Sequence, residues 1–368
     1  MSYIWQNKEW PVFTWDKAQV ESAYNRFLYQ KGLTDGVFSM LSDRSRQIMM
    51  AESLSSETVS SSSIEGVELQ YDSVYSSILK QLDVDMSFKA KHDRNAESVS
   101  KLIIDANRNH DPLTSERLMN WHCLLFDGVA KGFAPKHVGS FRTGPIYVVR
   151  NTRRETEIIY EGVPAERIVS EMEGLIAYIN SEQEPNLLVR SAVASLWFVS
   201  IHPFDDGNGR ISRAIADYIL SVHSGPEFRP YSMSSAILTD RRGYYDALHS
   251  AQTSEESDIT EWLVWYADTA CAGLSDAADQ CRRKLRVSTI MESLDPGVFN
   301  SRQLHMVYQL ANGSFFGRLT AEKWMKLTKC QSATATRDLS GLTEQGVLIR
   351  MGDGKKGTYY LLNPEFGE

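Results

Sequence analysis

Hydrophobic positions recur at helical spacing through most of this chain. Between about Asn95 and Ala267 the repeat of three to four residues predicts a largely uninterrupted series of helices. Nearer the N-terminus, Asp16 is a plausible N-cap for a helix that ends before Gly32, and a second helical pattern runs from about Phe38 to Ser60. The pattern therefore predicts a mainly α-helical protein. The later helices are expected at residues 95–107, 114–126, 165–180, 186–201, 209–222, 241–252 and 257–283.

One stretch inside this helical region has the character of strands. Residues 146–149 are apolar, residues 157–160 are mostly apolar, and the polar turn Asn151 to Arg154 separates the two runs. Two short β-rich runs around a polar turn predict a β-hairpin. We expect this hairpin within residues 139–160.

The last 70 or so residues form a different pattern. Helices are expected at 301–310, 320–327 and 332–345, followed by strands at 347–350 and 358–362 around Gly352-Asp353-Gly354. This order is typical of a winged helix-turn-helix domain. Residues 318–362 hold eight Lys and Arg against four Asp and Glu, a local charge of +4. That charge is compatible with contacts to a DNA backbone, but winged helices also bind proteins, and both uses stay open.

Composition and charge narrow the class of protein. The 368 residues are 42% hydrophobic and carry a net charge of −8, which argues against nucleic-acid binding by the chain as a whole. The four cysteines lack the short paired spacings of zinc or redox sites, so we expect reduced thiols. The start of the chain does not resemble a signal peptide, and the most apolar run, 192–201, is too short to span a bilayer. We expect a cytoplasmic protein without a membrane segment.

The N-terminal segment is rich in aromatic residues. Trp5, Trp10, Phe13 and Trp15 fall within fifteen residues. Aromatic side chains contribute large buried areas, so we expect this segment to pack onto the body of the protein.

The strongest chemical signal is the run from His202 to Arg213, which lies between two expected helices. Gly207 and Gly209 let the backbone approach a ligand closely, and the helix that follows presents unpaired N–H groups. Arg210 and Arg213 are three residues apart and can both contact one polyphosphate. Asn208 lies between the two glycines. The run therefore predicts a phosphate-binding loop.

Two further side chains of this run suit phosphate chemistry. Asp206 supplies a carboxylate of the kind that Mg²⁺ combines with substrate oxygens and water. His202 precedes the loop and is placed to accept a proton from an attacking hydroxyl. A base, a metal ligand and an anion site are thus expected together.

The twelve residues resemble the Fic family signature, His-Pro-Phe-x-Asp/Glu-Gly-Asn-Gly-Arg-x-x-Arg, at every fixed position. The resemblance implies a Fic-fold helical core and transfer of AMP from ATP to a Ser, Thr or Tyr hydroxyl of a target protein, with release of pyrophosphate. It implies that His202 is the base, that Asp206 holds Mg²⁺, and that the positions from Gly207 to Arg210, with Arg213, bind ATP. The expected hairpin is similar to the family's flap, which docks an extended segment of the target.

Several alternatives remain within and beyond this family. Because both glycines are retained, AMP transfer is favoured over phosphorylation, but phosphocholine transfer and removal of AMP stay open. The chain could also be a DNA-binding regulator whose Fic domain senses nucleotide, or a toxin-like interaction protein that acts through its flap. Self-modification and a homodimer are left open as well.

A second, shorter pattern lies upstream of the signature. Ser61 and Glu65 are four residues apart on one helical face, and Gly66 directly after them is a natural helix stop. The pattern resembles the family's inhibitory motif, Ser/Thr-x-x-x-Glu-Gly/Asn. The resemblance implies that Glu65 pairs with Arg213, takes the place of the γ-phosphate and holds ATP in an unreactive pose.

These patterns divide the chain into three parts. Residues 1–92 form an N-terminal helical region that includes the inhibitory helix, at about 44–66. Residues 93–283 form the catalytic core with its flap, and residues 284–368 form the winged-helix domain. Tyr244 and Tyr245 could border the nucleobase, but at helical spacing we interpret them as core residues.

Overall fold

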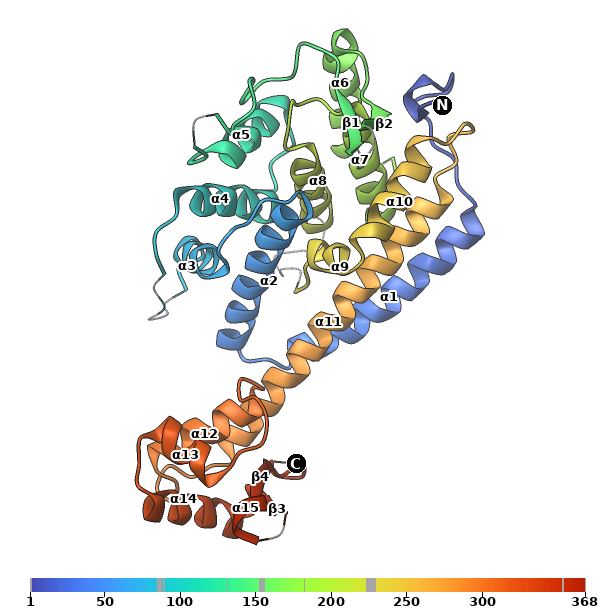
Figure 1. The fold of residues 1–368 in the computed structure, drawn as a ribbon. Coiled ribbons are helices and arrows are strands. Elements are labelled where there is room, and N and C mark those ends of the chain that lie inside the picture. The colour runs from blue at the N-terminus through green and yellow to red at the C-terminus, as the bar shows by residue number, and fades with distance from the viewer. Residues whose placement is uncertain are drawn as a thin grey trace. The chain divides into compact units, whose positions relative to one another are not determined.

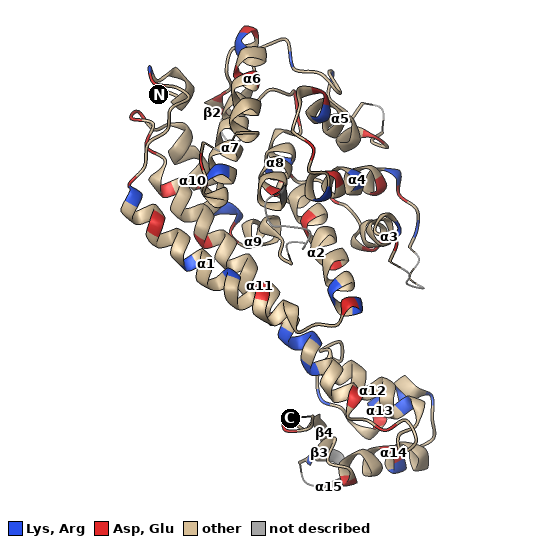
Figure 2. Cartoon of the chain, turned by 180° about the vertical axis from the view of Figure 1, so that it is seen from behind, with Lys and Arg blue, Asp and Glu red and all other residues tan. Residues whose placement is uncertain are grey.

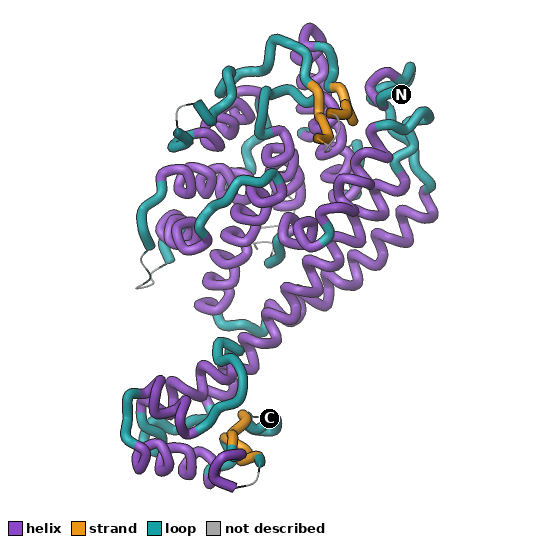
Figure 3. Tube along the Cα trace, viewed as in Figure 1, coloured by secondary structure: helices purple, strands orange, loops and turns teal. Residues whose placement is uncertain are grey.

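The computed structural model describes residues 2–84, 88, 90–130, 132–151, 156–181, 183–222, 230–352 and 354–367. The described chain is mainly helical, with two short antiparallel hairpins (Figure 3). It divides into two compact units, the first formed by Met1–Asp35 and Asp43–Ala277 and the second by Gly36–Ser42 and Ala278–Glu368. The mainly α fold class expected from the sequence is confirmed.

Eleven described helices belong wholly or mostly to the first unit (Figure 1). The central pair is α7 and α8, which pack on each other, and α7 is buried almost along its whole length. Helices α2, α3, α4, α5 and α6 contribute to the same apolar core. The bounds are α1 Lys17–Ser39, α2 Asp43–Ile64, α3 Tyr71–Gln81, α4 Arg94–Arg108, α5 Ser115–Phe126, α6 Ile168–Ile179, α7 Leu187–Ile201, α8 Asn208–Val222, α9 Met233–Thr239, α10 Arg241–Gln252 and α11 Thr260–Glu292.

Three features of these helices differ from the sequence-based expectation. Asp16 caps α1, because its Oδ1 accepts from the backbone N–H of Ala18 and of Gln19, but the helix runs through Gly32 to Ser39. Thr34, beyond Gly32, is buried and donates its hydroxyl to the Leu274 carbonyl of α11. Packing against α11 thus overrides the weak local preference of glycine to end a helix. Helices α3 and α9 were not expected, and α11 extends nine residues further than expected.

The N-terminal aromatic residues pack onto the body of the first unit, as expected. Trp10 and Phe13 each contact the Trp197 ring of α7 edge to face, at 6.1 Å between ring centroids. The indole N–H of Trp5 donates to the Glu161 carbonyl at 2.8 Å. The segment therefore ties the first residues of the chain to α7 and to the end of the hairpin.

The expected hairpin is present in the first unit. Strands β1, Tyr147–Asn151, and β2, Thr156–Glu161, pair antiparallel with a register shift between Val148 and Val149. The residues between them lie outside the described part of the chain. The inner end of the hairpin is anchored in the body, because Tyr160 is buried and donates its hydroxyl to the Ser200 carbonyl at 2.7 Å.

The second unit contains three helices followed by a hairpin, close to the expected positions. They are α12 Ser301–Ala311, α13 Ala321–Thr328, α14 Ser332–Glu344, β3 Leu348–Met351 and β4 Tyr359–Leu362, with a short helix α15, Gly354–Gly357, that was not expected. Trp324, Leu339 and Leu342 are fully buried in its core. Assignment of this unit to the winged-helix class, like the division of the chain into three parts, stays a prediction.

Acidic and basic side chains are interspersed along the helices (Figure 2). All four cysteines are free thiols. None of the described helices combines the length and the apolar character that crossing a bilayer requires.

Candidate active site

His202 occupies the end of α7 in a strained backbone conformation. Its φ is +54°, in the left-handed region, and its N–H donates to the Phe198 carbonyl at 3.0 Å. Nδ1 lies 3.1 Å from the Val199 carbonyl oxygen. Because a carbonyl only accepts, this contact assigns the proton to Nδ1 and leaves Nε2 as an acceptor. Burial lowers the pKa of His202 to about 4, so the imidazole is neutral at pH 7.

Two buried side chains of the loop after His202, those of Phe204 and Asn208, hold its conformation. Phe204 is fully buried and stacks on the His122 ring at 4.1 Å between centroids. Asn208, also buried, accepts from the Phe204 N–H and donates to the Phe204 carbonyl. Both polar atoms of the Asn208 side chain are therefore engaged within the loop. A contact from Asn208 to a phosphate would come from its backbone N–H at the start of α8.

The two glycines of the loop are needed for different reasons. Gly207 has a φ of +82°, which side chains rarely adopt, and a Cβ there would lie 3.0 Å from Leu125. At Gly209 a Cβ would lie 2.0 Å from Oε1 of Glu65. The Glu65 carboxylate thus rests directly on the first turn of α8, where the helix dipole favours negative charge.

The two arginines of the run are both buried. Arg213 is 5% exposed and donates from Nε to the Ser61 hydroxyl at 2.9 Å and from Nη2 to the Ser61 carbonyl at 2.8 Å. Its Nη1 forms an ion pair with Glu65 Oε1 at 2.9 Å. Burial alone would lower the pKa of Arg213, but Glu65, together with Tyr244 and Glu57, raises the pKa above its ordinary value. Ser61 thus binds two nitrogens of the Arg213 guanidinium through hydrogen bonds, and Glu65 faces the third, Nη1, as an ion pair without a hydrogen bond.

Arg210 has a different environment. It is 5% exposed, its Nη2 lies 3.7 Å from Asp206 Oδ2, and burial lowers its pKa. Its Nε is buried and makes no hydrogen bond in the described structure. A buried donor without an acceptor is costly, and a phosphate oxygen is the kind of partner that would satisfy it. Asp206 is more open, with its side chain 59% exposed and Oδ1 accepting from the Gly207 N–H at 2.6 Å.

The residues upstream join the site as the end of α2. Ser61 and Ile64 are buried, and Gly66 has a φ of +77° that ends the helix. The N–H of Val67 returns to the Ser62 carbonyl, which closes the turn. The structure therefore brings Ser61 and Glu65 together with the run from His202 to Arg213, which lies far downstream in the sequence.

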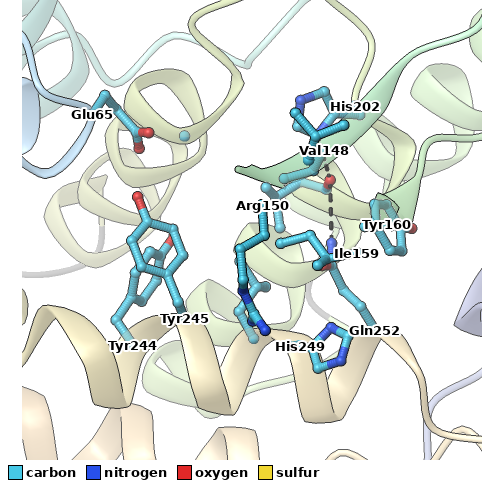
Figure 4. A pocket seen from close by; sticks show the side chains of 14 residues that line it. Glu65, Val148, Arg150, Ile159, Tyr160, His202, Tyr244, Tyr245, His249 and Gln252 are labelled. Atoms are coloured by element: carbon cyan, nitrogen blue, oxygen red, sulfur yellow. Dashed lines mark hydrogen bonds between the residues drawn. The ribbon is translucent and has the colours of Figure 1, made fainter. Parts of the chain in front are cut away.

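A pocket of about 380 Å³ opens beside these groups (Figure 4). It is lined by Glu65, His202 and Gly209, by residues of β1 and β2, and by α10. The Glu65 carboxylate lies on the side toward which the hydroxyls of Tyr244 and Tyr245 point. Burial raises the pKa of Tyr244 to about 12, and the Tyr245 hydroxyl donates to the Ile64 carbonyl at 3.2 Å. Tyr244 is a core residue, as expected, whereas Tyr245 is 38% exposed and the same expectation was wrong for it. Both tyrosines line the pocket.

Sequence reasoning missed two residues, Arg142 and Gly162, that contact the backbone and the Cβ of His202. Arg142 is buried, donates from Nε to the His202 carbonyl at 2.7 Å, and also reaches the carbonyls of Gly144 and Val163. A Cβ on Gly162 would lie 3.0 Å from the His202 Cβ. These residues lie outside the signature, and no local pattern in the sequence marks them.

The loop has a second support that sequence reasoning also missed. His122 contacts the Asp206 carbonyl through Nε2 and accepts from the Gly139 N–H. Since its ring also stacks on Phe204, His122 fixes both the backbone and the buried side chain of the loop.

Comparison with known families identifies the core. Residues 112–220 match the Fic/DOC family model, and this range includes the whole run from His202 to Arg213. The chain contains a Fic domain. Residues 3–84, which include α2, match a domain of unknown function, DUF4172.

Curated relatives of this Fic domain are named as adenylyltransferases. The chain is 24% identical over 166 residues to the protein adenylyltransferase fic-1 of Caenorhabditis elegans. The aligned region covers 45% of this chain and 29% of that protein. The chain is 25% identical over 199 residues to a probable protein adenylyltransferase of Aquifex aeolicus, covering 48% and 53%. The matched regions thus span between about a third and about half of these relatives.

Solved structures share the fold. A Fic family protein from Desulfovibrio desulfuricans matches with a TM-score of 0.55 at 19% identity, over 96% of this chain and 98% of that one. The Fic-1 structure of C. elegans matches with a TM-score of 0.51 at 18% identity, over 72% and 74%. The mainly helical Fic fold is therefore established for this chain.

Proposed function

We propose that this protein transfers AMP from ATP to a Ser, Thr or Tyr hydroxyl of a target protein. The observation that carries the proposal is a neutral, acceptor-ready His202 beside an anion site at the first turn of α8. An attacking hydroxyl needs a base that is unprotonated at working pH, and a polyphosphate needs convergent donors. Both requirements are met within one loop. The adenylyltransferase relatives support the same reaction.

In the proposed reaction, His202 Nε2 accepts the proton of the target hydroxyl while the hydroxyl oxygen attacks the α-phosphorus of ATP. The bond from the α-phosphorus to its bridging oxygen breaks, and pyrophosphate leaves with the electron pair. Arg210, Arg213 and the backbone N–H groups of Gly207 to Gly209 would hold the phosphates. The pocket lined by Tyr244 and Tyr245 is large enough for a nucleoside.

We further propose that Asp206 helps to hold Mg²⁺ when ATP is bound. Among the described residues, no three His, Cys, Asp or Glu side chains form a metal-binding group. A single open carboxylate nevertheless fits Mg²⁺, because this ion takes one or two carboxylates together with phosphate oxygens and water. The bound ion would neutralise charge on the polyphosphate.

We propose that the described state is inhibited by the chain's own Glu65. Its carboxylate lies against the first turn of α8 and pairs with Arg213. An ATP phosphate would need both the N–H groups of that turn and the Arg213 guanidinium. A carboxylate and a phosphate compete for the same donors, so one excludes the other. Inhibition follows if Arg213 cannot reach the γ-phosphate.

The flap is the proposed docking site for the target. Tyr147, Val149 and Ile158 of the flap strands are large apolar side chains that are 43–51% exposed. A short exposed hairpin can pair with an extended peptide through main-chain hydrogen bonds. The second unit is proposed as a winged helix that selects partners.

Two forms of labelled ATP test the reaction. Radioactive phosphorus at the α position should appear on protein, whereas label at the γ position should not. The His202→Ala variant should bind ATP but transfer no label. Label transferred from the γ position would indicate phosphorylation. Nucleotide binding without any transfer, even by Glu65→Gly, would favour a nucleotide sensor.

A further inference from the structure

The last three turns of α2 bury several polar side chains. Ser55, Thr58 and Ser62 are buried and donate their hydroxyls to carbonyls one turn earlier in the same helix. The Ser60 hydroxyl lies 3.0 Å from the Ser235 hydroxyl of α9. Apolar burial therefore contributes less to this part of α2 than to its earlier turns, where Ala51 and Leu54 lie in the core.

The Glu57 carboxylate makes the largest number of hydrogen bonds among these buried polar side chains. It is 3% exposed and accepts three hydrogen bonds from the start of α9. Oε2 accepts from the Ser232 hydroxyl at 2.8 Å and from the Ser234 N–H at 3.0 Å, and Oε1 accepts from the Ser234 hydroxyl. Ser232 is also the N-cap of α9, since its hydroxyl oxygen accepts from the Ser235 N–H. A buried carboxylate depends on such donors, so the contact fixes α2 in one register on α9.

The position of Glu57 links this contact to the candidate active site. Glu57, Ser61 and Glu65 are spaced by four residues, so they follow one face of the helix and its end. Eight residues of α-helix span about 12 Å. Ser61 and Glu65 together hold Arg213, whereas Glu57 holds the same helix to α9. A shift of α2 at Glu57 would therefore be carried along the helix to Arg213.

We propose that Glu57 is a positioning residue that keeps α2 docked on α9 so that Glu65 and Ser61 hold Arg213 in the inhibited arrangement. The proposal rests on inhibition by Glu65. The Nη1 group of Arg213 must leave Glu65 before it can contact a phosphate. Release of the polar contact at Glu57 raises the fraction of molecules in which the end of α2 has moved away.

The Glu57→Ala variant tests this role, since it leaves Ser61, Glu65 and the whole run from His202 to Arg213 unchanged. Loss of buried hydrogen bonds to a carboxylate shifts the docking equilibrium by roughly tenfold. We expect initial transfer from α-labelled ATP to rise by about that factor. The matched control is Glu68→Ala, which removes an exposed carboxylate just beyond α2 and should leave the rate unchanged.

The same substitution in the Glu65→Gly background separates positioning from general loosening of the fold. Once the inhibitory carboxylate is absent, the docking of α2 no longer controls Arg213 through it. Glu57→Ala should then change the rate by less than about twofold. A similar gain in both backgrounds would show that Glu57 acts on another part of the enzyme, and would overturn the proposal.

Folding is checked by thermal unfolding and circular dichroism. If Glu57→Ala does not fold, Ser234→Ala removes one of the three donors to Glu57 without placing a cavity in α2, and a smaller gain in the same direction is expected. A folded variant with no gain, beside a Glu65→Gly enzyme that is activated, would refute the role of Glu57 alone. If Glu65→Gly itself shows no gain, the proposed inhibition fails first.

Discussion

Replacement of Glu65 by glycine removes the carboxylate that pairs with Arg213. In the structure, Glu65 Oε1 lies 2.9 Å from Arg213 Nη1, with 28% of the Glu65 side chain and 5% of the Arg213 side chain exposed. The substitution would leave the Ser61 contacts of Arg213 in place but would free the first turn of α8. We expect Glu65→Gly to transfer AMP faster than the wild type.

The size of the gain follows from the contact. A charge-assisted pair to a buried arginine is worth about 1.5 to 3 kcal/mol, which corresponds to roughly tenfold to a hundredfold in an equilibrium. The position of the carboxylate at the N-terminus of α8 adds about 0.3 to 1 kcal/mol. The gain should therefore reach at least about tenfold. Glu65→Gln, which keeps the size of the side chain and removes its charge, should give an intermediate gain.

The assay compares initial rates of protein labelling from α-labelled ATP by wild type, Glu65→Gly and Glu65→Gln at equal concentration. Calorimetric titration with ATP and Mg²⁺ should show a smaller change in affinity than in rate, because inhibition acts mainly through the pose of the phosphates. Equal or weaker labelling by Glu65→Gly would refute the reasoning. The contact with Arg213 would then be a structural helix end without a regulatory role.

Three further outcomes are expected. Nuclear magnetic resonance titration should give His202 a pKa near 4, below the unfolded value of 6.5. The free energy of unfolding should therefore fall by up to about 3 kcal/mol as the pH is lowered from 6.5 to 4, and by less in His202→Asn. A His202 pKa at or above 6.5 would contradict this expectation. Asp206→Ala should lose transfer, as should the wild type in excess EDTA, and undiminished activity in EDTA would exclude the metal. Gly162→Ala places a Cβ 2.7 Å from Ile146 and 3.0 Å from His202, so it should lower the free energy of unfolding by about 1 to 3 kcal/mol and remove most of the activity. In the control Gly174→Ala the new Cβ meets nothing closer than 3.7 Å, so stability and activity should both be kept.

The sequence allowed most of the helices to be predicted, because long amphipathic segments carry a clear period. The errors lie where tertiary packing decides. Gly32 was expected to end α1, but contact with α11 carries the helix to Ser39. Helix α9 has only seven residues, too few for a reliable period.

The candidate site was predictable in part for a similar reason. The run from His202 to Arg213 is contiguous, so its chemistry could be inferred before any contact was known. The ion pair between Glu65 and Arg213 was expected only from the resemblance to the Fic family. Arg142 and Glu57 could not be found, since each acts through backbone carbonyls or serine hydroxyls that are distant in sequence.

The most direct test of AMP transfer is intact-mass spectrometry of Glu65→Gly after incubation with ATP, Mg²⁺ and acceptor peptides that carry Ser, Thr and Tyr. We expect the mass of one adenylyl group on the protein or on a peptide, and no addition in the Glu65→Gly, His202→Ala double variant. Addition of a phosphate mass, or no addition to either acceptor by the folded single variant, would contradict the proposed reaction.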